Sequence, residues 1–303
     1  MAKPHMIYVT LVENLSLVFV AGLITALATG LGALPFFFVD EFSDRWNVGL
    51  WGIASGIMVT VSLFGLVDEG LAYASGGFPT LMAGGLLAGV GLVVVSDHVL
   101  GDVDLTEMTD SSDNNASEIR ANGAGDNPDL APEARAFAEG DLKKLVLILG
   151  ILTVHSFPEG VAVGVSFAEL GLDGGASILG FSIPLLAVFM TIAISIHNIP
   201  EGTAIAIPMR ALGLSNWRMV GAAVFSSLPQ PIGAVIAFVF VSWAEAFLPF
   251  GFGFAAGAMV YLVVTEFIPE AIETGSDLPN RGYPELLAGL AAGVIAMIPV
   301  MYI

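Results

Sequence analysis

Two copies of one short motif, H-x-x-P-E-G, hold the residues of this chain that are best suited to chemistry. They occupy residues 155–160 and 197–202. In a helix, a His and a Glu four positions apart lie on one face, one turn from each other. Imidazole nitrogens and carboxylate oxygens are good ligands for Zn²⁺, and Fe²⁺, Co²⁺ and Mn²⁺ accept them too. We therefore predict a divalent-metal site whose four ligands are His155, Glu159, His197 and Glu201.

The composition places this site in a membrane. Hydrophobic residues make up 56% of the 303-residue chain and charged residues 12%, about half of the share in soluble domains. A spanning helix needs about 20 mostly apolar residues. Eight stretches meet this need, at residues 7–38, 49–71, 77–100, 143–168, 178–209, 217–243, 248–271 and 284–303. We predict an all-α, polytopic membrane protein with eight transmembrane helices.

The two motifs fall near the middle of the fourth and fifth spans, which run in opposite directions. The spacing predicts an inverted-repeat arrangement around these two helices, a pattern typical of transporters. Two ionised glutamates in hydrocarbon would cost at least ~2.5–3.5 kcal/mol each on insertion scales. With neutral histidines the four ligands carry two negative charges, which one divalent cation cancels. The chain has no cysteine, so a thiolate site is excluded.

A polar, acidic segment at residues 101–142 divides the chain. We expect spans one to three in residues 1–100, a disordered loop at 101–142, and spans four to eight, with the metal site, in 143–303. The net charge is −19, which argues against nucleic acid as a partner. Such an acid excess is typical of proteins from a high-salt cytoplasm, as in salt-loving archaea.

Basic residues predict the orientation in the cell membrane. With eight spans and both termini outside, only Lys3 lies on the outer side. The acidic loop 101–142 is then cytoplasmic. The basic residues on the inner side are Arg45, Arg120, Arg135, Lys143, Lys144, Arg210, Arg218 and Arg281.

Several functions are compatible with paired His and Glu residues in a bilayer. The main alternative to metal transport is an intramembrane zinc-dependent hydrolase, for which the chain lacks an HExxH motif and an obvious nucleophile. A proton or sodium antiporter is less favoured because histidines accompany the glutamates. A metal sensor is less favoured because the short loops offer no output domain. The lipid bilayer and divalent ions are the expected partners, and a homodimer is left open.

The sequence resembles the ZIP (Zrt/Irt-like protein) family of divalent-metal transporters, most closely its prokaryotic branch. The resemblance rests on the two H-x-x-P-E-G motifs and on four further stretches. They are ALATGLGALPFF (26–37), GIMVTVSLFGLVDEG (56–70), SLPQPIG (227–233) and AAGAMVYLVVTEFIPEA (255–271). The resemblance implies a non-enzymatic carrier that moves Zn²⁺ or a similar ion toward the cytoplasm, with the metal as transported substrate and not as a resident cofactor.

The family also implies a second metal beside the first, bridged by the same glutamates. The matching positions here are Ser156, Asn198 and Gln230, where the family usually has a carboxylate at the last. Because all three side chains are neutral, we predict that this second site is weak or absent, and an ion-free polar cluster is the alternative. Glu266, within span seven, is a candidate for the ion pathway. The family moves spans one, four, five and six against spans two, three, seven and eight.

Overall fold

The computed structural model describes residues 4–39, 42–73, 79–101, 155–168, 170, 175–178 and 180–302. The predicted acidic loop, apart from Gly101, and the first part of the predicted fourth span (143–154) lie outside the described residues. The domain boundaries at 101 and 142 therefore stay predictions.

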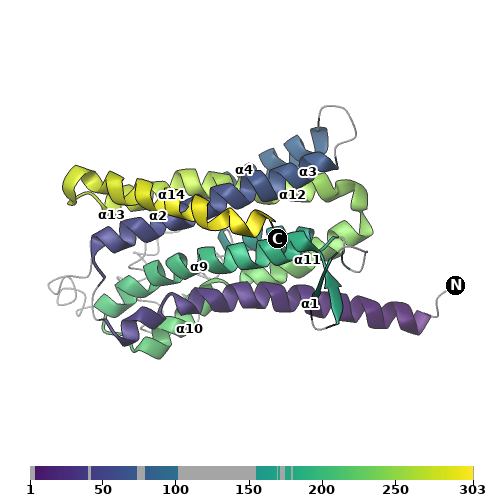
Figure 1. The fold of residues 1–303 in the computed structure, drawn as a ribbon, viewed down its shortest axis with the longest axis horizontal. Coiled ribbons are helices and arrows are strands. Elements are labelled where there is room, and N and C mark those ends of the chain that lie inside the picture. Colours follow the sequence, from purple (N-terminus) through teal and green to yellow (C-terminus); the bar gives the residue numbers. More distant parts are fainter. Residues whose placement is uncertain are drawn as a thin grey trace.

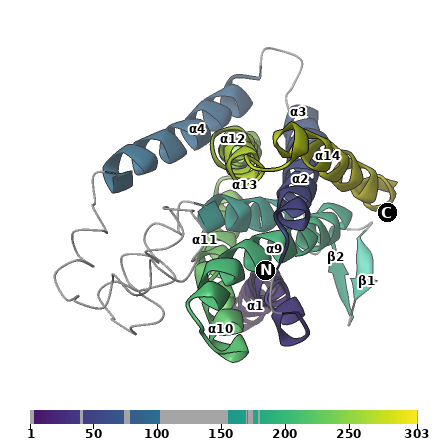
Figure 2. The same ribbon diagram turned by 90° about the vertical axis from the view of Figure 1, so that its left-hand side faces the viewer.

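The described helices form two groups that lie side by side along their length (Figures 1 and 2). We call the lower group in Figure 1 the motif bundle, because it carries both H-x-x-P-E-G motifs, and the upper group the frame bundle. The motif bundle consists of α1 (Pro4–Leu31), a helix at residues 155–166, α9 (Leu185–Ala211), α10 (Asn216–Ser226) and α11 (Pro229–Trp243). The frame bundle consists of α2 (Asp44–Thr60), a π-helix (Val61–Val67), α3 (Asp68–Ala72), α4 (Thr80–Gly101), α12 (Leu248–Leu262), a second π-helix (Val263–Phe267), α13 (Ile268–Thr274) and α14 (Tyr283–Met297).

Short 3-10 turns connect or end several helices. They lie at Leu34–Phe37, Glu245–Phe247, Pro279–Gly282 and Pro299–Tyr302.

Glycines hold the frame bundle together in two parallel helix pairs. A Cβ on Gly85 or Gly89 of α4 would collide with the carbonyl oxygen of Phe250 or Phe254 on α12. Because both contacts advance together along the two helices, α4 and α12 run in the same direction. Helices α2 and α14 pair in the same way, through further glycines on each helix. Such close backbone approach is the usual role of small residues between membrane helices.

Six described stretches are long and apolar enough to cross a membrane. They are Val12–Leu31, Asp44–Ala72, Leu185–Ile207, Asn216–Trp243, Glu245–Thr274 and Pro279–Met301. Thr80–Ser96 is a shorter apolar helix, and the described part of the predicted fourth span is helical over 155–166. The chain is therefore a predominantly helical, polytopic membrane protein.

The prediction of an all-α fold is wrong in one place. Strands β1 (Ala176–Ile178) and β2 (Phe181–Ile183) pair as an antiparallel hairpin, with Ser177 opposite Ser182. The predicted fifth span, 178–209, included part of this hairpin, whereas α9 begins at Leu185. Hydropathy cannot distinguish a short apolar strand from the start of an apolar helix, and Gly180, with φ of +87°, allows the turn.

The predicted sixth span, 217–243, is also not one continuous helix. Helix α10 ends at Ser226, and α11 begins at Pro229. Proline has no backbone N–H, so Pro229 cannot donate to the carbonyl of Phe225 and the α10 ladder stops there. The break places Gln230 in the first turn of a new helix inside the protein, where its side chain is fully buried.

Candidate metal centre

Three of the four predicted primary ligands converge in the motif bundle. Ligand atoms of Glu159, His197 and Glu201 all lie within 4.8 Å of one another. The side chains of Glu159 and His197 are 2% and 1% exposed, and Glu201 is partly buried. A group of two carboxylates and one imidazole matches the donor set that Zn²⁺ and similar ions accept.

The neighbouring helices bring the two motifs together from opposite directions. The helix at 155–166 runs parallel to α11, since Gly160 lies against Gln230 and Gly164 against Ala234. Helix α11 in turn runs antiparallel to α1, since Gly22 lies against Pro231 while Thr29, further along α1, contacts Ser227, which precedes α11. Helices α1 and α9 are parallel, because Thr25 contacts Asn198 and Thr29 contacts Gly202. The first motif helix and α9 therefore run in opposite directions.

The glycine that ends each motif allows this close packing. A Cβ on Gly160 would collide with the carbonyl oxygen of Gln230, and a Cβ on Gly202 with that of Thr29. Both positions need glycine because the opposing atoms are backbone, which cannot move aside as a side chain can. The motif glycines thus place the glutamates beside them at the depth where the ligands meet.

His155, the fourth predicted ligand, takes another partner. Its Nε2 contacts Oε2 of Glu266, which belongs to the π-helix of the frame bundle. The structure thus places Glu266 against a motif histidine and next to the site. π-Helical turns occur frequently at functional sites, and this one contributes a contact between the two bundles.

His197 is held by the frame bundle in a different way. Its Nδ1 lies 3.2 Å from the carbonyl oxygen of Ala54 on α2, and its Nε2 lies 3.5 Å from Oε1 of Glu159. The ring of Phe267 stacks on the imidazole, with centroids 5.5 Å apart and planes at 18°. These contacts fix both the position and the plane of the imidazole ring.

Two of the three residues of the predicted second site, Asn198 and Gln230, are hydrogen-bonded to each other. Asn198 donates from Nδ2 to the carbonyl of Thr25, at 2.8 Å, and to Oε1 of Gln230, at 3.0 Å. Gln230 donates from Nε2 to Oε2 of Glu159. Because a carboxylate only accepts, this bond fixes which end of the Gln230 amide faces Glu159. We call this chain of bonds, from Thr25 through Asn198 and Gln230 to Glu159, the amide relay.

Ser156 stands outside the amide relay. Its hydroxyl donates to the carbonyl of Ser226, at 3.1 Å, at the end of α10 where the helix break leaves carbonyl groups without helical partners. Ser156 therefore ties the first motif to the broken helix.

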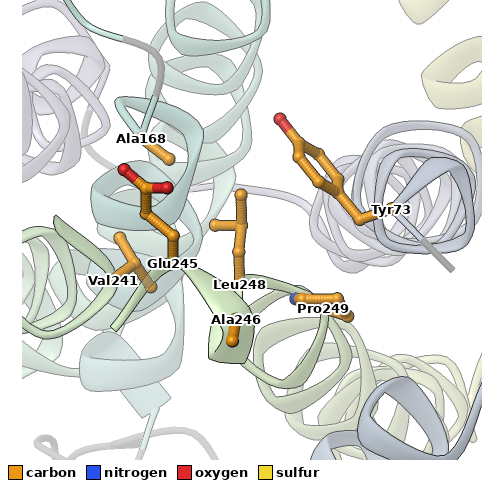
Figure 3. Close-up of a pocket in the computed structure, with 7 residues that line it drawn as sticks. All are labelled: Tyr73, Ala168, Val241, Glu245, Ala246, Leu248 and Pro249. Atoms are coloured by element: carbon orange, nitrogen blue, oxygen red, sulfur yellow. The ribbon is translucent and has the colours of Figure 1, made fainter. Parts of the chain in front are cut away.

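A cavity of about 430 Å³ lies apart from the metal ligands, where the two bundles meet. Ala168 and Val241 line it from the motif bundle, and Tyr73 and Leu248 from the frame bundle. Glu245, between α11 and α12, lies at its edge, and Figure 3 shows Leu248 between Glu245 and Tyr73.

Sequence reasoning missed three groups that touch residues of the site. They are the Ala54 carbonyl and the Phe267 ring, which contact His197, and the Thr25 carbonyl, which accepts from Asn198. Backbone carbonyls have no signature in a sequence. Phe267 follows Glu266 directly, but an aromatic residue in an apolar span is usually a packing residue. The sequence therefore gave no indication that Phe267 contacts His197.

Comparison with known proteins shows the family of the chain. A model of the ZIP zinc transporter family matches residues 96–299, and this chain belongs to that family, as its motifs predicted. ZIP proteins are transporters and not enzymes, so the expectation of a non-enzymatic function is confirmed at the level of the family.

Similar proteins occur in a plant and in bacteria. A putative zinc transporter of Arabidopsis thaliana is 37% identical over 251 residues, which make up 83% of this chain and 34% of the plant protein. Zinc transporter GufA of Myxococcus xanthus is 30% identical over 84% of this chain and 89% of its own length. Zinc transporter ZupT of Stenotrophomonas maltophilia is 30% identical over 93% of each chain. The chain thus spans about a third of the plant protein but most of the two bacterial ones.

Proposed function

We propose that this protein carries divalent transition-metal ions across the cell membrane toward the cytoplasm by alternating access. Zn²⁺ is the favoured substrate, and Fe²⁺, Mn²⁺, Co²⁺ and Cd²⁺ suit the same ligands. The observation that carries the proposal is the convergence of Glu159, His197 and Glu201 within two apolar helices. Two carboxylates within apolar helices, one buried and one partly buried, need a compensating cation, and a divalent ion supplies both charges.

The ion binds between spans four and five, with Glu159, His197 and Glu201 as its first ligands and His155 as the fourth. Four ligands complete the tetrahedral shell that Zn²⁺ prefers. Their mixed N and O character suits an ion that must also leave, since no thiolate is present to hold it.

The protein binds one ion at a time. A second ion would need an unengaged oxygen of a bridging glutamate, but the amide relay directs the Gln230 N–H group at Oε2 of Glu159. The relay residues add no negative charge to balance another cation. This arrangement supports the prediction that the second site, at Ser156, Asn198 and Gln230, is weak or absent.

Helix directions support eight crossings. Since α4 and α12 are parallel, an odd number of crossings must separate them in the chain. Helix α9 and the α10–α11 pair make two, so the helix that includes residues 155–166 makes the third. Between the parallel helices α2 and α14 the same helix at 155–166 brings the number of crossings to five, again an odd number.

The described basic residues support the proposed orientation, with outer termini and a cytoplasmic loop at 101–142. Arg45, Arg210 and Arg218 lie near ends of α2, α9 and α10, and Arg281 lies in the 3-10 turn before α14. These helix ends lie at the left in Figure 1. The start of α1 lies at the opposite end.

Zinc uptake into proteoliposomes with an entrapped zinc-sensitive dye tests the proposal. The wild-type protein should increase dye fluorescence. A Glu201→Gln variant should lower the uptake rate at least about tenfold, since even changes around a metal's ligands cost 10–100-fold. Glu273→Gln, an exposed carboxylate of α13, is the matched control and should transport normally. Absence of uptake by the wild type, or full uptake by Glu201→Gln, would overturn the proposal.

A further inference from the structure

The two motif histidines occupy equivalent positions in identical motifs, yet the frame bundle contacts them through different nitrogens. His197 meets the Ala54 carbonyl through Nδ1. His155 meets Glu266 through Nε2. Consecutive residues of one π-helix take part, since Glu266 contacts His155 and Phe267 stacks on His197.

The contact with Ala54 decides which nitrogen of His197 can bind a metal. A carbonyl oxygen only accepts, so Nδ1 must carry the hydrogen. In a neutral ring Nε2 then keeps its lone pair, on the side that faces Glu159 at 3.5 Å. Metal-binding histidines usually donate their other N–H to a carbonyl or a carboxylate, which sets the tautomer and the ring orientation. The Ala54 carbonyl and the Phe267 ring fulfil this role from the opposite bundle.

The contact with Glu266 has the reverse effect on His155. His155 Nε2 lies within hydrogen-bond reach of a Glu266 oxygen, unlike His197 Nε2, which lies 3.5 Å from Glu159. An ionised carboxylate only accepts, so in the neutral His155 ring Nε2 carries the hydrogen and the lone pair is on Nδ1. The ring must break its contact with Glu266 before Nε2 can join the other three ligands.

We propose that the frame bundle selects the ligand set of the metal site. The Ala54 carbonyl and Phe267 present His197 as a ready ligand, while Glu266 withholds His155 until an ion has been captured by the other three. Ala54, Phe267 and Glu266 are thus positioning residues. The proposal rests on the proposed function of the site, and it follows that a displacement between the bundles changes both histidines at once.

Measuring the tautomers of His155 and His197 in the metal-free protein tests the proposed selection of ligands directly. The chain has only four histidines (His5, His98, His155 and His197), so ¹⁵N-histidine labelling of the full chain gives a readable NMR spectrum. His155→Gln and His197→Gln variants assign the two signals by their loss. We expect the hydrogen on Nδ1 in His197 and on Nε2 in His155. The same neutral tautomer in both, or the reverse pattern, would overturn the proposal.

Two variants separate positioning from general packing. Phe267→Leu should reduce the fraction of His197 with hydrogen on Nδ1 and weaken zinc binding about tenfold by titration calorimetry. Its control is Phe252→Leu, which replaces another buried frame-bundle ring and should change neither the His197 tautomer nor the zinc affinity.

Glu266→Ala should let His155 exchange between tautomers while His197 keeps its hydrogen on Nδ1. Thr265→Ala, its neighbour with an exposed side chain, should have no effect on His155.

The outcomes distinguish this inference from the proposed function. Normal zinc uptake with identical tautomers at His155 and His197 would contradict the ligand selection alone. Opposite tautomers in a protein that takes up no metal would contradict transport alone. If Phe267→Leu and Phe252→Leu weaken zinc binding equally, the role assigned to Phe267 is wrong.

Discussion

Gln230 donates a hydrogen bond from Nε2 to Oε2 of Glu159, a buried contact between residues 71 positions apart in the chain. Glu159 is a metal ligand in the proposed mechanism, and Gln230 lies at the start of the helix that follows the break in span six. The bond gives Glu159 a defined orientation and occupies the oxygen that a second ion would need.

Replacing Gln230 by Glu should create the second site. The substitution removes the N–H donor and adds the negative charge that another divalent ion requires. We expect the zinc content of the purified protein, measured by mass spectrometry of the metal, to rise from one to two ions per chain. Gln230→Leu is the control, since it removes the donor without adding charge and should leave the content at one. A content of one in Gln230→Glu would contradict this role of the relay.

Gly202→Ala should destabilise the motif bundle. A methyl group at this position meets the backbone carbonyl of Thr29, and overpacking of this kind costs about 1–3 kcal/mol. The matched control is Gly221→Ala on α10, where nothing lies within 4 Å of the added Cβ. The control should match or exceed the stability of the wild type, because alanine favours helix more than glycine does. Thermal unfolding in detergent measures both variants, and equal midpoints would contradict the packing described here.

Adjacent glycines of α4 offer an equally strict comparison in the frame bundle. Gly85→Ala places a methyl group against the carbonyl of Phe250, whereas Gly84→Ala faces space with nothing within 4 Å. We expect Gly85→Ala to lower the unfolding midpoint and Gly84→Ala to maintain or raise it. Two variants with the same loss would show that α4 and α12 do not pack through Gly85.

Single cysteines should report the topology, because the natural chain has none to remove. Glu245→Cys, in an exposed turn between α11 and α12, should react with a membrane-impermeant maleimide added outside intact cells. Asp277→Cys, exposed between α13 and α14, should react only after the cells are opened. The reverse pattern would invert the proposed orientation, and reaction of both from outside would contradict the number of crossings.

Exposed charge pairs should contribute little by comparison. Nε of Arg45 lies 3.5 Å from Oε1 of Glu285, and the arginine side chain is 61% exposed. Surface ion pairs usually contribute about 0–1 kcal/mol. Arg45→Ala should therefore change the unfolding midpoint less than Gly202→Ala does, and raising the salt concentration should reduce even this difference.

Much of this protein followed from the sequence alone. Apolar stretches long enough to cross a bilayer are local features, so most spans were predicted correctly. The two H-x-x-P-E-G motifs were predicted to supply ligands, and Glu159, His197 and Glu201 do converge. Their place on one face of each helix was predictable because the spacing of His and Glu within one helix turn is a property of the helix itself. Their binding of a metal ion stays a prediction. Family membership followed from the same motifs.

The tertiary structure decided which groups contact the two motif histidines. Glu266 lies 111 positions from His155, and Ala54 lies 143 positions from His197. Neither pairing has a local signal, and the Ala54 group is a backbone carbonyl that every residue possesses. The hairpin before α9 and the break before α11 were also missed, because hydropathy measures how apolar a segment is and not how its backbone hydrogen bonds are paired. The sequence thus determines the donors of the metal centre, while packing between the two bundles determines the orientation of each histidine.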